Sequence, residues 1–156
     1  MVGESLVKYC GGTFEIASFE EDTKRHIDLW WESPKKGRIG IDVKGVKKLK
    51  RSDNETDDSI HWIEIRNTQG KKGWIYGDME YIAFVTNYDI LFVKPKELYG
   101  NILFNTIGKN LLHENINLEL YSPYQRKDRK DVIIKIPTSE LREISHFSIS
   151  KYEPNV

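Results

Sequence analysis

The sequence predicts an α/β fold, a sandwich in which a central mixed sheet is flanked by helices. Several short segments alternate apolar and polar residues with the period of two that is typical of half-buried strands. Helical patterns lie before and after this block of strands, which favours a mixed sheet over an alternating, doubly wound one. With 156 residues, 38% of them hydrophobic, the chain can build a core of ordinary size. We therefore treat residues 1–156 as a single domain.

The elements can be placed in order along the chain. A helix is expected over Thr13–Thr23, capped by Thr13 after two glycines. Short strands follow at His26–Glu32, Arg38–Lys44 and Ile60–Arg66, then a hairpin of Tyr81–Thr86 with Asp89–Lys94. Pro95 suits the first turn of a further helix. A strand at Asp131–Ile136 and a short helix at Ser139–Ile144, capped by Thr138, complete the prediction.

Composition excludes several classes of protein. The 24 basic and 24 acidic residues balance, so the global charge indicates no partner. No apolar run approaches the roughly 18 residues that a bilayer span needs, and the N-terminus has no apolar stretch of a secretion signal. With Cys10 alone, neither an intrachain disulfide nor a cysteine-based zinc site can form. We expect a cytoplasmic protein in a reducing compartment.

Charge is nevertheless uneven along the chain. Residues 35–51 hold eight basic side chains, Lys47 and Lys48 among them, and one acid, and an acidic run follows. The glycine-rich stretch 67–74 adds Gln69, Lys71 and Lys72. Lysines, amides and backbone N–H groups suit contacts with the phosphates of a nucleic acid. A solvated loop and a glycine-rich turn are the alternative interpretations of these two stretches.

Two acids and a lysine stand out in the strand region. Alternation puts Asp42 and Lys44 on one face of their strand, opposite its apolar residues. If the preceding strand forms a hairpin centred on Lys35, Asp28 lies opposite Asp42, because each is seven residues from the centre. Paired carboxylates repel each other unless a cation lies between them, and Mg²⁺ or Mn²⁺ is the cation that oxygen ligands favour. Lys44 would bind a phosphate or orient a water.

Asp28, thirteen intervening residues and then Asp42-Val43-Lys44 resembles the PD-(D/E)XK nuclease superfamily. The resemblance covers roughly residues 12–94 and departs from the superfamily pattern at Ile27, where a proline often stands. It implies a restriction-endonuclease-like fold and an Mg²⁺-dependent endonuclease that hydrolyses phosphodiester bonds in DNA, of the kind found in viruses and mobile elements.

The resemblance also implies roles for individual residues. Asp28 and Asp42 would bind the metal together with the Val43 carbonyl, and Lys44 would assist the attacking water. A further acid would come from the first helix, and Glu15 is preferred there over Glu20 and Glu21. The alternative interpretation is that the two aspartates and the lysine form a salt bridge on an edge hairpin, without a catalytic role.

Two other functions stay open at this stage. The first is a non-catalytic nucleic-acid-binding module of the same fold, and the second is a protein-interaction or inhibitor module that uses an aromatic surface. Dimerisation would double the surface available to DNA. Glu64 would either join the site or pair with a neighbouring cation. The four tryptophans, which could stack on bases, more often cover a sheet: Trp30, Trp31, Trp62 and Trp74.

Overall fold

The computed structural model describes residues 1–48, 56–113 and 119–152. Its helices are α1 (Val2–Cys10), α2 (Phe19–Arg25), the 3₁₀ turn η1 (Trp74–Tyr76), α3 (Pro95–Thr106) and α4 (Thr138–Ile144). Its strands are β1 (Thr13–Ile16), β2 (Leu29–Ser33), β3 (Gly37–Lys44), β4 (Lys47–Lys48), β5 (Thr56–Asp57), β6 (Ile60–Arg66), β7 (Tyr81–Val85), β8 (Asp89–Val93), β9 (Val132–Pro137) and β10 (Phe147–Ser150).

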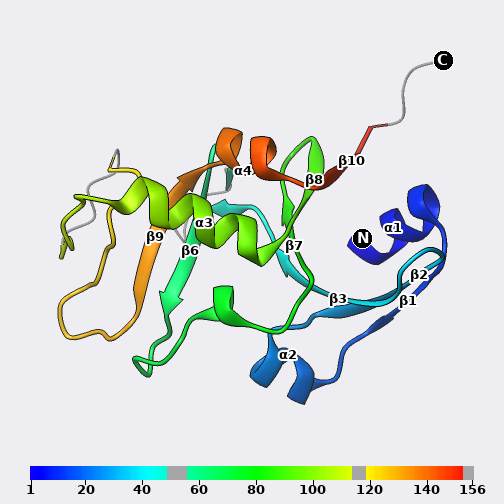
Figure 1. Ribbon diagram of the computed structural model, residues 1–156, viewed down its shortest axis with the longest axis horizontal. Coiled ribbons are helices and arrows are strands. Elements are labelled where there is room, and N and C mark those ends of the chain that lie inside the picture. Colours follow the sequence, from blue (N-terminus) through cyan, green and yellow to red (C-terminus); the bar gives the residue numbers. More distant parts are fainter. Residues whose placement is uncertain (49–55, 114–118, 153–156) are drawn as a thin grey trace.

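The main sheet is mixed, as predicted. It runs in the order β1-β2-β3-β7-β8-β10, and every neighbouring pair is antiparallel except β3 and β7, which are parallel. Strands β6 and β9 form a separate antiparallel pair, as do β4 and β5. In Figure 1, β1, β2 and β3 extend to one side of β7, and the β6–β9 pair lies on the other side. The predicted general class, α/β with a central mixed sheet, is confirmed.

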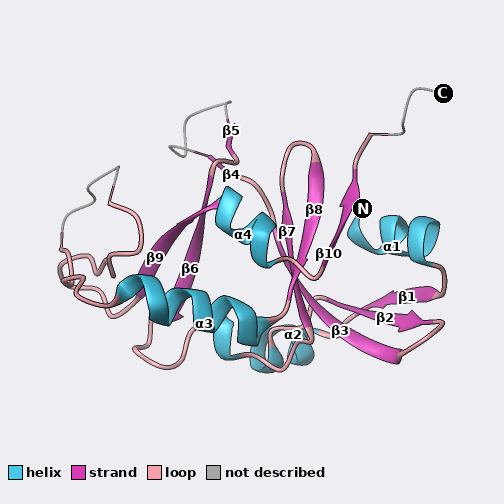
Figure 2. Ribbon diagram, turned by 45° about the horizontal axis from the view of Figure 1, so that its top comes forward, coloured by secondary structure: helices cyan, strands magenta, loops and turns pink. Residues whose placement is uncertain are grey.

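Helices cover both faces of this sheet. One core contains side chains of α1 and of the sheet face that carries Ile39, Ile41 and Tyr81. The other core contains side chains of α3, α4, β6 and β9, packed against the face that carries Ile82 and Phe84. Figure 2 shows α1 beside β1 and β2, well separated from α3 and α4. Among the described residues no helix is long and apolar enough to cross a bilayer.

Most of the predicted strands are present. β3 and β6 match their predicted ranges almost residue for residue, and β7 and β8 form the expected hairpin. Pro95 is the first residue of α3, where its missing N–H costs no hydrogen bond. The alternation of apolar and polar residues in β3 and β6 explains this success, although Gly40 and Asp42 on the more polar face of β3 are buried as well.

The N-terminal region differs from the prediction. Thr13 begins a strand, β1, and the helix starts only after Ser18, whose Oγ accepts a hydrogen bond from the Glu21 N–H at 3.1 Å. Glu21 returns the bond to the Ser18 N–H at 3.2 Å, which completes a capping box. Residues 13–16 therefore form a strand paired with β2, although the spacing of their apolar residues favours a helix. The sequence analysis also missed α1.

Two smaller predictions at the C-terminal end are wrong or incomplete. Thr138 is the first residue of α4 and not its cap; Pro137 precedes the helix, and the Thr138 hydroxyl donates to the Asp58 carbonyl instead. Strand β10, which pairs with β8 at the edge of the sheet, was not predicted. Only Ile149 of its four residues is buried, so its alternation is too short to stand out in the sequence.

Gly12 is required by the turn between α1 and β1. Its φ is +82°, and a Cβ there would lie 2.0 Å from the Glu32 carbonyl oxygen. We expect Gly12→Ala to lower the free energy of unfolding by about 2–4 kcal/mol. Gly100, in the middle of α3, has nothing within 4 Å of its Cβ position. Gly100→Ala should therefore stabilise by about 0.5–1 kcal/mol. Urea denaturation of both variants checks this pair, and equal shifts of the midpoint would contradict it.

Candidate metal centre

The β2–β3 hairpin has the predicted register. Leu29 pairs with Ile41 and Ser33 with Gly37, so the two strands are symmetric about Lys35. Asp28 lies just before β2, and its N–H donates to the Ile41 carbonyl at 2.8 Å, outside the regular ladder. The hairpin thus brings the segment that holds Asp28 beside the segment that holds Asp42.

Asp28 is fixed against the backbone of the neighbouring strand. Its Oδ2 accepts a hydrogen bond of 2.6 Å from the N–H of Val43, the residue between Asp42 and Lys44. Asp28 as a whole is half-buried. The predicted approach of the two aspartates is therefore present, and it is held by a main-chain bond.

Asp42 is the unusual residue of the site. It is only 2% exposed, and its Oδ1 lies 2.9 Å from the Lys44 Nζ. Its Oδ2 is buried and accepts no hydrogen bond from any described residue. Burial raises the pKa of Asp42 to about 7, Lys44 lowers it, and a hydrogen bond with the Asp28 carboxyl and the charge of Asp28 raise it further. The neutral form of Asp42 is thus stabilised by a proton shared with Asp28, whereas the ionised form leaves Oδ2 without a donor, which is costly unless a cation binds it.

Lys44 projects from the same face as Asp42 and is 23% exposed. Its Nζ lies 4.4 Å from the ring centroid of Trp74, which comes from η1. On β7, Phe84 is the residue paired with Lys44. The ring of His61, on β6, packs edge-on against the ring of Phe84, with the ring centroids 5.1 Å apart. The Trp74 ring and the Asp42 carboxylate therefore hold the ammonium group in place. No pattern in the sequence indicates that Trp74, thirty residues further along the chain, lies beside Lys44.

These donors suit a divalent metal ion such as Mg²⁺. Two carboxylates and the Val43 carbonyl are the hard oxygen ligands that Mg²⁺ prefers. No cluster of three or more His, Cys, Asp or Glu side chains that could hold a metal occurs in the described ranges. Mg²⁺ commonly takes one or two carboxylates and completes its shell with water and substrate phosphate. The unsatisfied Oδ2 of Asp42 is the observation on this structure that favours such an ion.

Glu15 does not belong to this site, contrary to prediction. It lies on β1 opposite Trp30, and its Oε1 is 2.7 Å from an Arg38 guanidinium nitrogen. Arg38 also pairs with Glu32 at 2.9 Å. The helix on which Glu15 was expected begins only at Phe19, so its carboxylate is placed by strand pairing and by Arg38 instead.

Glu64 does not extend the pair either. Its strand β6 pairs with β9 and not with the main sheet, and Glu64 lies opposite Ile133. Alternation places Glu64 on the face opposite to buried Ile63, whereas His61 turns inward toward Phe84. Of the two interpretations left open for Glu64, a role outside the acidic pair agrees with this placement.

The residues predicted to contact nucleic acid are not gathered at the aspartates. Gln69 and Lys71 lie in the turn after β6, where their backbone N–H groups each donate to Asn67 Oδ1 at 3.0 Å. Lys72 lies over the Tyr76 ring at 5.7 Å. Lys47 and Lys48 form β4, and the neighbouring residues 49–55 lie outside the described ranges. Asn67 thus closes this segment as a glycine-rich turn, which was the alternative to a phosphate-binding role.

Three of the four tryptophans are buried. Trp30, Trp31 and Trp74 are 8%, 6% and 9% exposed, so they cover the sheet rather than present their faces to a base. Trp62 is half-buried on β6, with the Lys135 Nζ 5.1 Å from its ring centroid.

The chain is 27% identical over 125 residues to a protein of Plasmodium falciparum (isolate 3D7) described as an adenylate kinase isoenzyme 6 homolog. The match covers 73% of this chain and 66% of that relative, so it spans slightly less than two thirds of the relative's length. No protein-family model matches the chain. No solved structure matches it either, and the restriction-endonuclease-like form of the α/β class therefore stays a prediction.

This similarity corrects the predicted function. An adenylate kinase acts on nucleotides, whereas the sequence analysis predicted a DNA endonuclease with Asp28, Asp42 and Lys44 as its catalytic residues. The prediction of a DNA nuclease, and of a DNA-binding hydrolase generally, is wrong on this finding. Mg²⁺, the predicted cofactor, is compatible with both kinds of enzyme, because phosphoryl transfer from nucleotides also uses it.

Proposed function

We propose that this chain is a Mg²⁺-dependent enzyme that transfers a phosphoryl group of a nucleotide. Asp28 and Asp42 would hold the metal ion together with the Val43 carbonyl, and Lys44 would contact the phosphate. The observation that carries the proposal is Asp42, buried and with one oxygen unsatisfied, beside a lysine at 2.9 Å. The similarity to an adenylate kinase homolog supports a nucleotide as the substrate.

The chain's own residues suit this chemistry. A metal ion bound here would neutralise charge on the phosphate oxygens. Lys44 is a compact positive charge, held by Asp42 and by the Trp74 ring, and is exposed enough to reach a ligand. The Val43 N–H orients the Asp28 carboxylate, so the two acids are placed before any substrate binds. Phosphoryl transfer depends mainly on such positioning and charge stabilisation.

The sequence contains no Gly-x₄-Gly-Lys-Ser/Thr stretch, the glycine-rich loop with which many nucleotide-binding enzymes hold phosphates. The stretch nearest to that pattern, Gly40 to Gly45, is followed by Val46 and is part of β3 and its end. The phosphate would therefore be held by side chains and metal rather than by a loop of this kind. The proposal assigns that role to the aspartate pair and Lys44.

Turnover of nucleotides tests the proposal. ATP is incubated with the chain and Mg²⁺, alone or with AMP or another nucleoside monophosphate as acceptor, and the products are separated by chromatography. We expect transfer of the terminal phosphoryl group to the acceptor, which yields two diphosphates, and loss of turnover in EDTA. Asp28→Asn and Asp42→Asn should each lower the rate by about 100-fold or more.

Glu15→Gln is the matched control, because Glu15 is an acid of the same sheet that pairs with Arg38 instead of the site. Its turnover should stay within about twofold of the parent protein. Turnover that survives in Asp42→Asn would overturn the proposal, and so would the absence of turnover with every acceptor.

A further inference from the structure

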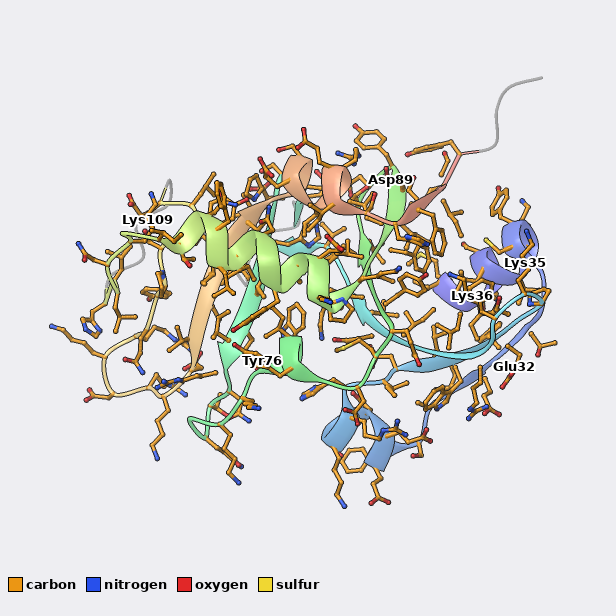
Figure 3. All side chains as sticks on the ribbon, viewed as in Figure 1. Glu32, Lys35, Lys36, Tyr76, Asp89 and Lys109 are labelled. Atoms are coloured by element: carbon orange, nitrogen blue, oxygen red, sulfur yellow. The ribbon has the colours of Figure 1, made fainter. Side chains whose placement is uncertain are left out.

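A cleft lies at the beginnings of β3 and β7, away from the aspartate pair. It consists of two adjoining hollows of about 550 and 460 Å³ that share Lys36, Ile39 and Tyr81. Ile39 and Tyr81 belong to the core on the α1 side of the sheet, whereas Asp42 projects from the opposite face. Figure 3 shows Lys35 and Lys36 on the α1 side of the β2–β3 turn, where this cleft opens.

The cleft is strongly basic in a chain of zero net charge. Five cations and one acid line it: Lys35, Lys36, Arg38, Lys94, Lys96 and Glu80. Arg38 is occupied by Glu15 and Glu32, and Glu80 accepts a hydrogen bond from the Gly40 N–H. No ion pair with a described carboxylate joins any of the four lysines. Their positive charges are therefore available to a ligand bound in the cleft.

Two lysines also lie at the start of α3. Lys94 precedes the helix, Pro95 is its first residue, and Lys96 follows. The positive end of the helix dipole adds to these charges, and Glu97 is the acid in the first turn that opposes them. Desolvation lowers the pKa of His146, the residue before β10, and the charges of Lys94 and Lys36 lower it further. Side chains from the β2–β3 turn, the start of α3 and the segment before β10 therefore share one positive field.

Aromatic rings form one wall of the cleft. His146 is exposed and stacks on Tyr81, with ring centroids 5.7 Å apart and planes at 29°. Phe147 meets Tyr81 edge-on at 5.5 Å and stacks on Phe92 at 4.4 Å. The exposed face of this wall is suited to stacking by a flat ring, and stacking does not require a particular base.

We propose that this cleft binds a nucleoside polyphosphate without a metal ion, its phosphates on Lys36, Lys94 and Lys96 and its base against His146. A free polyphosphate would satisfy the lysines but not the aromatic wall, and a nucleoside would satisfy only the wall. The site is separate from the aspartate pair, and it goes beyond the proposed phosphoryl transfer. ATP would occupy it in EDTA.

Calorimetric titration in EDTA tests this site with three probes: ATP, inorganic tripolyphosphate and adenosine. We expect ATP to bind more tightly than tripolyphosphate by about tenfold, and adenosine to bind weakest. The double variant Lys36→Ala, Lys94→Ala should weaken ATP binding by about tenfold or more. His146→Ala should remove the preference for ATP over tripolyphosphate and leave tripolyphosphate binding unchanged.

Lys109→Ala is the matched control, because Lys109 is an exposed lysine at the far end of the molecule from Lys36 (Figure 3). ATP binding that is equal in the parent and the double variant, or weakened as much by Lys109→Ala, would overturn the proposal. Equal affinity for ATP and tripolyphosphate would contradict the placement of the base against His146. Asp42→Asn should keep ATP binding in EDTA even though it loses turnover, so failure of one site is distinguishable from failure of the other.

Discussion

Asp42→Asn is expected to stabilise the metal-free protein above pH 7 while it removes Mg²⁺ binding. The environment of Asp42 favours the protonated carboxyl, because burial outweighs the attraction of Lys44 and raises the pKa to about 7. Asparagine is the neutral analogue of that form in nearly the same volume. We expect a gain of about 1–3 kcal/mol in the free energy of unfolding at pH 8 in EDTA.

The sign of this change separates a ligand-binding acid from a structural one. If the Asp42–Lys44 pair existed to hold the hairpin together, its loss would destabilise the fold. Thermal unfolding in EDTA and in excess Mg²⁺ distinguishes the two cases, since Mg²⁺ should raise the midpoint of the parent protein only. Asp22→Asn, which changes an exposed acid on α2, should shift the midpoint little in either condition. A destabilised Asp42→Asn protein would contradict the account.

The second large effect is a dependence of stability and of metal affinity on pH. In the folded protein Asp42 titrates near pH 7, whereas in the unfolded chain it titrates near 3.8. Between these values the folded state binds the additional proton, so the stabilising contribution is complete below about pH 4 and is lost as the pH rises through 7. Relative to Asp42→Asn, the parent should lose on the order of 2–4 kcal/mol between pH 4 and pH 8.

Metal binding should follow the opposite trend. A proton and Mg²⁺ compete for the same carboxylate, so Mg²⁺ affinity should rise about tenfold per pH unit below pH 7 and level off above it. Calorimetric titrations at pH 5.5, 6.5, 7.5 and 8.5 measure this slope. An affinity that does not change between pH 5.5 and pH 7.5 would show that Asp42 is not the ligand.

The hairpin that builds the site could be predicted because local rules determine it. Alternation fixed the faces of β3, and the position of the turn fixed the register about Lys35. Neither rule predicts how deeply a side chain is buried. Asp42 is almost fully buried and Trp74 lies against its lysine because η1 and β7 pack beside β3, and packing between distant segments leaves no periodic signal in the chain.

The same limit explains the errors. Glu15 was assigned to a helix from spacing, but β2 offered its segment an edge to pair with, and a strand formed. The basic cleft joins residues from the β2–β3 turn, the start of α3 and β10, including a strand that the sequence analysis missed. No pattern in the sequence indicates the class of enzyme: the predicted DNA endonuclease is wrong, whereas the predicted Mg²⁺ stays compatible with the similarity to an adenylate kinase homolog.

Electron paramagnetic resonance at pH 8 shows whether the aspartate pair binds a metal ion, because free and bound Mn²⁺ give different signals. We expect one bound ion per chain, displaced by excess Mg²⁺ and lost in Asp42→Asn and Asp28→Asn, while Glu15→Gln binds as the parent does. Equal Mn²⁺ binding by the parent and Asp42→Asn would contradict this expectation, and the buried carboxylate would then have to be explained by the fold alone.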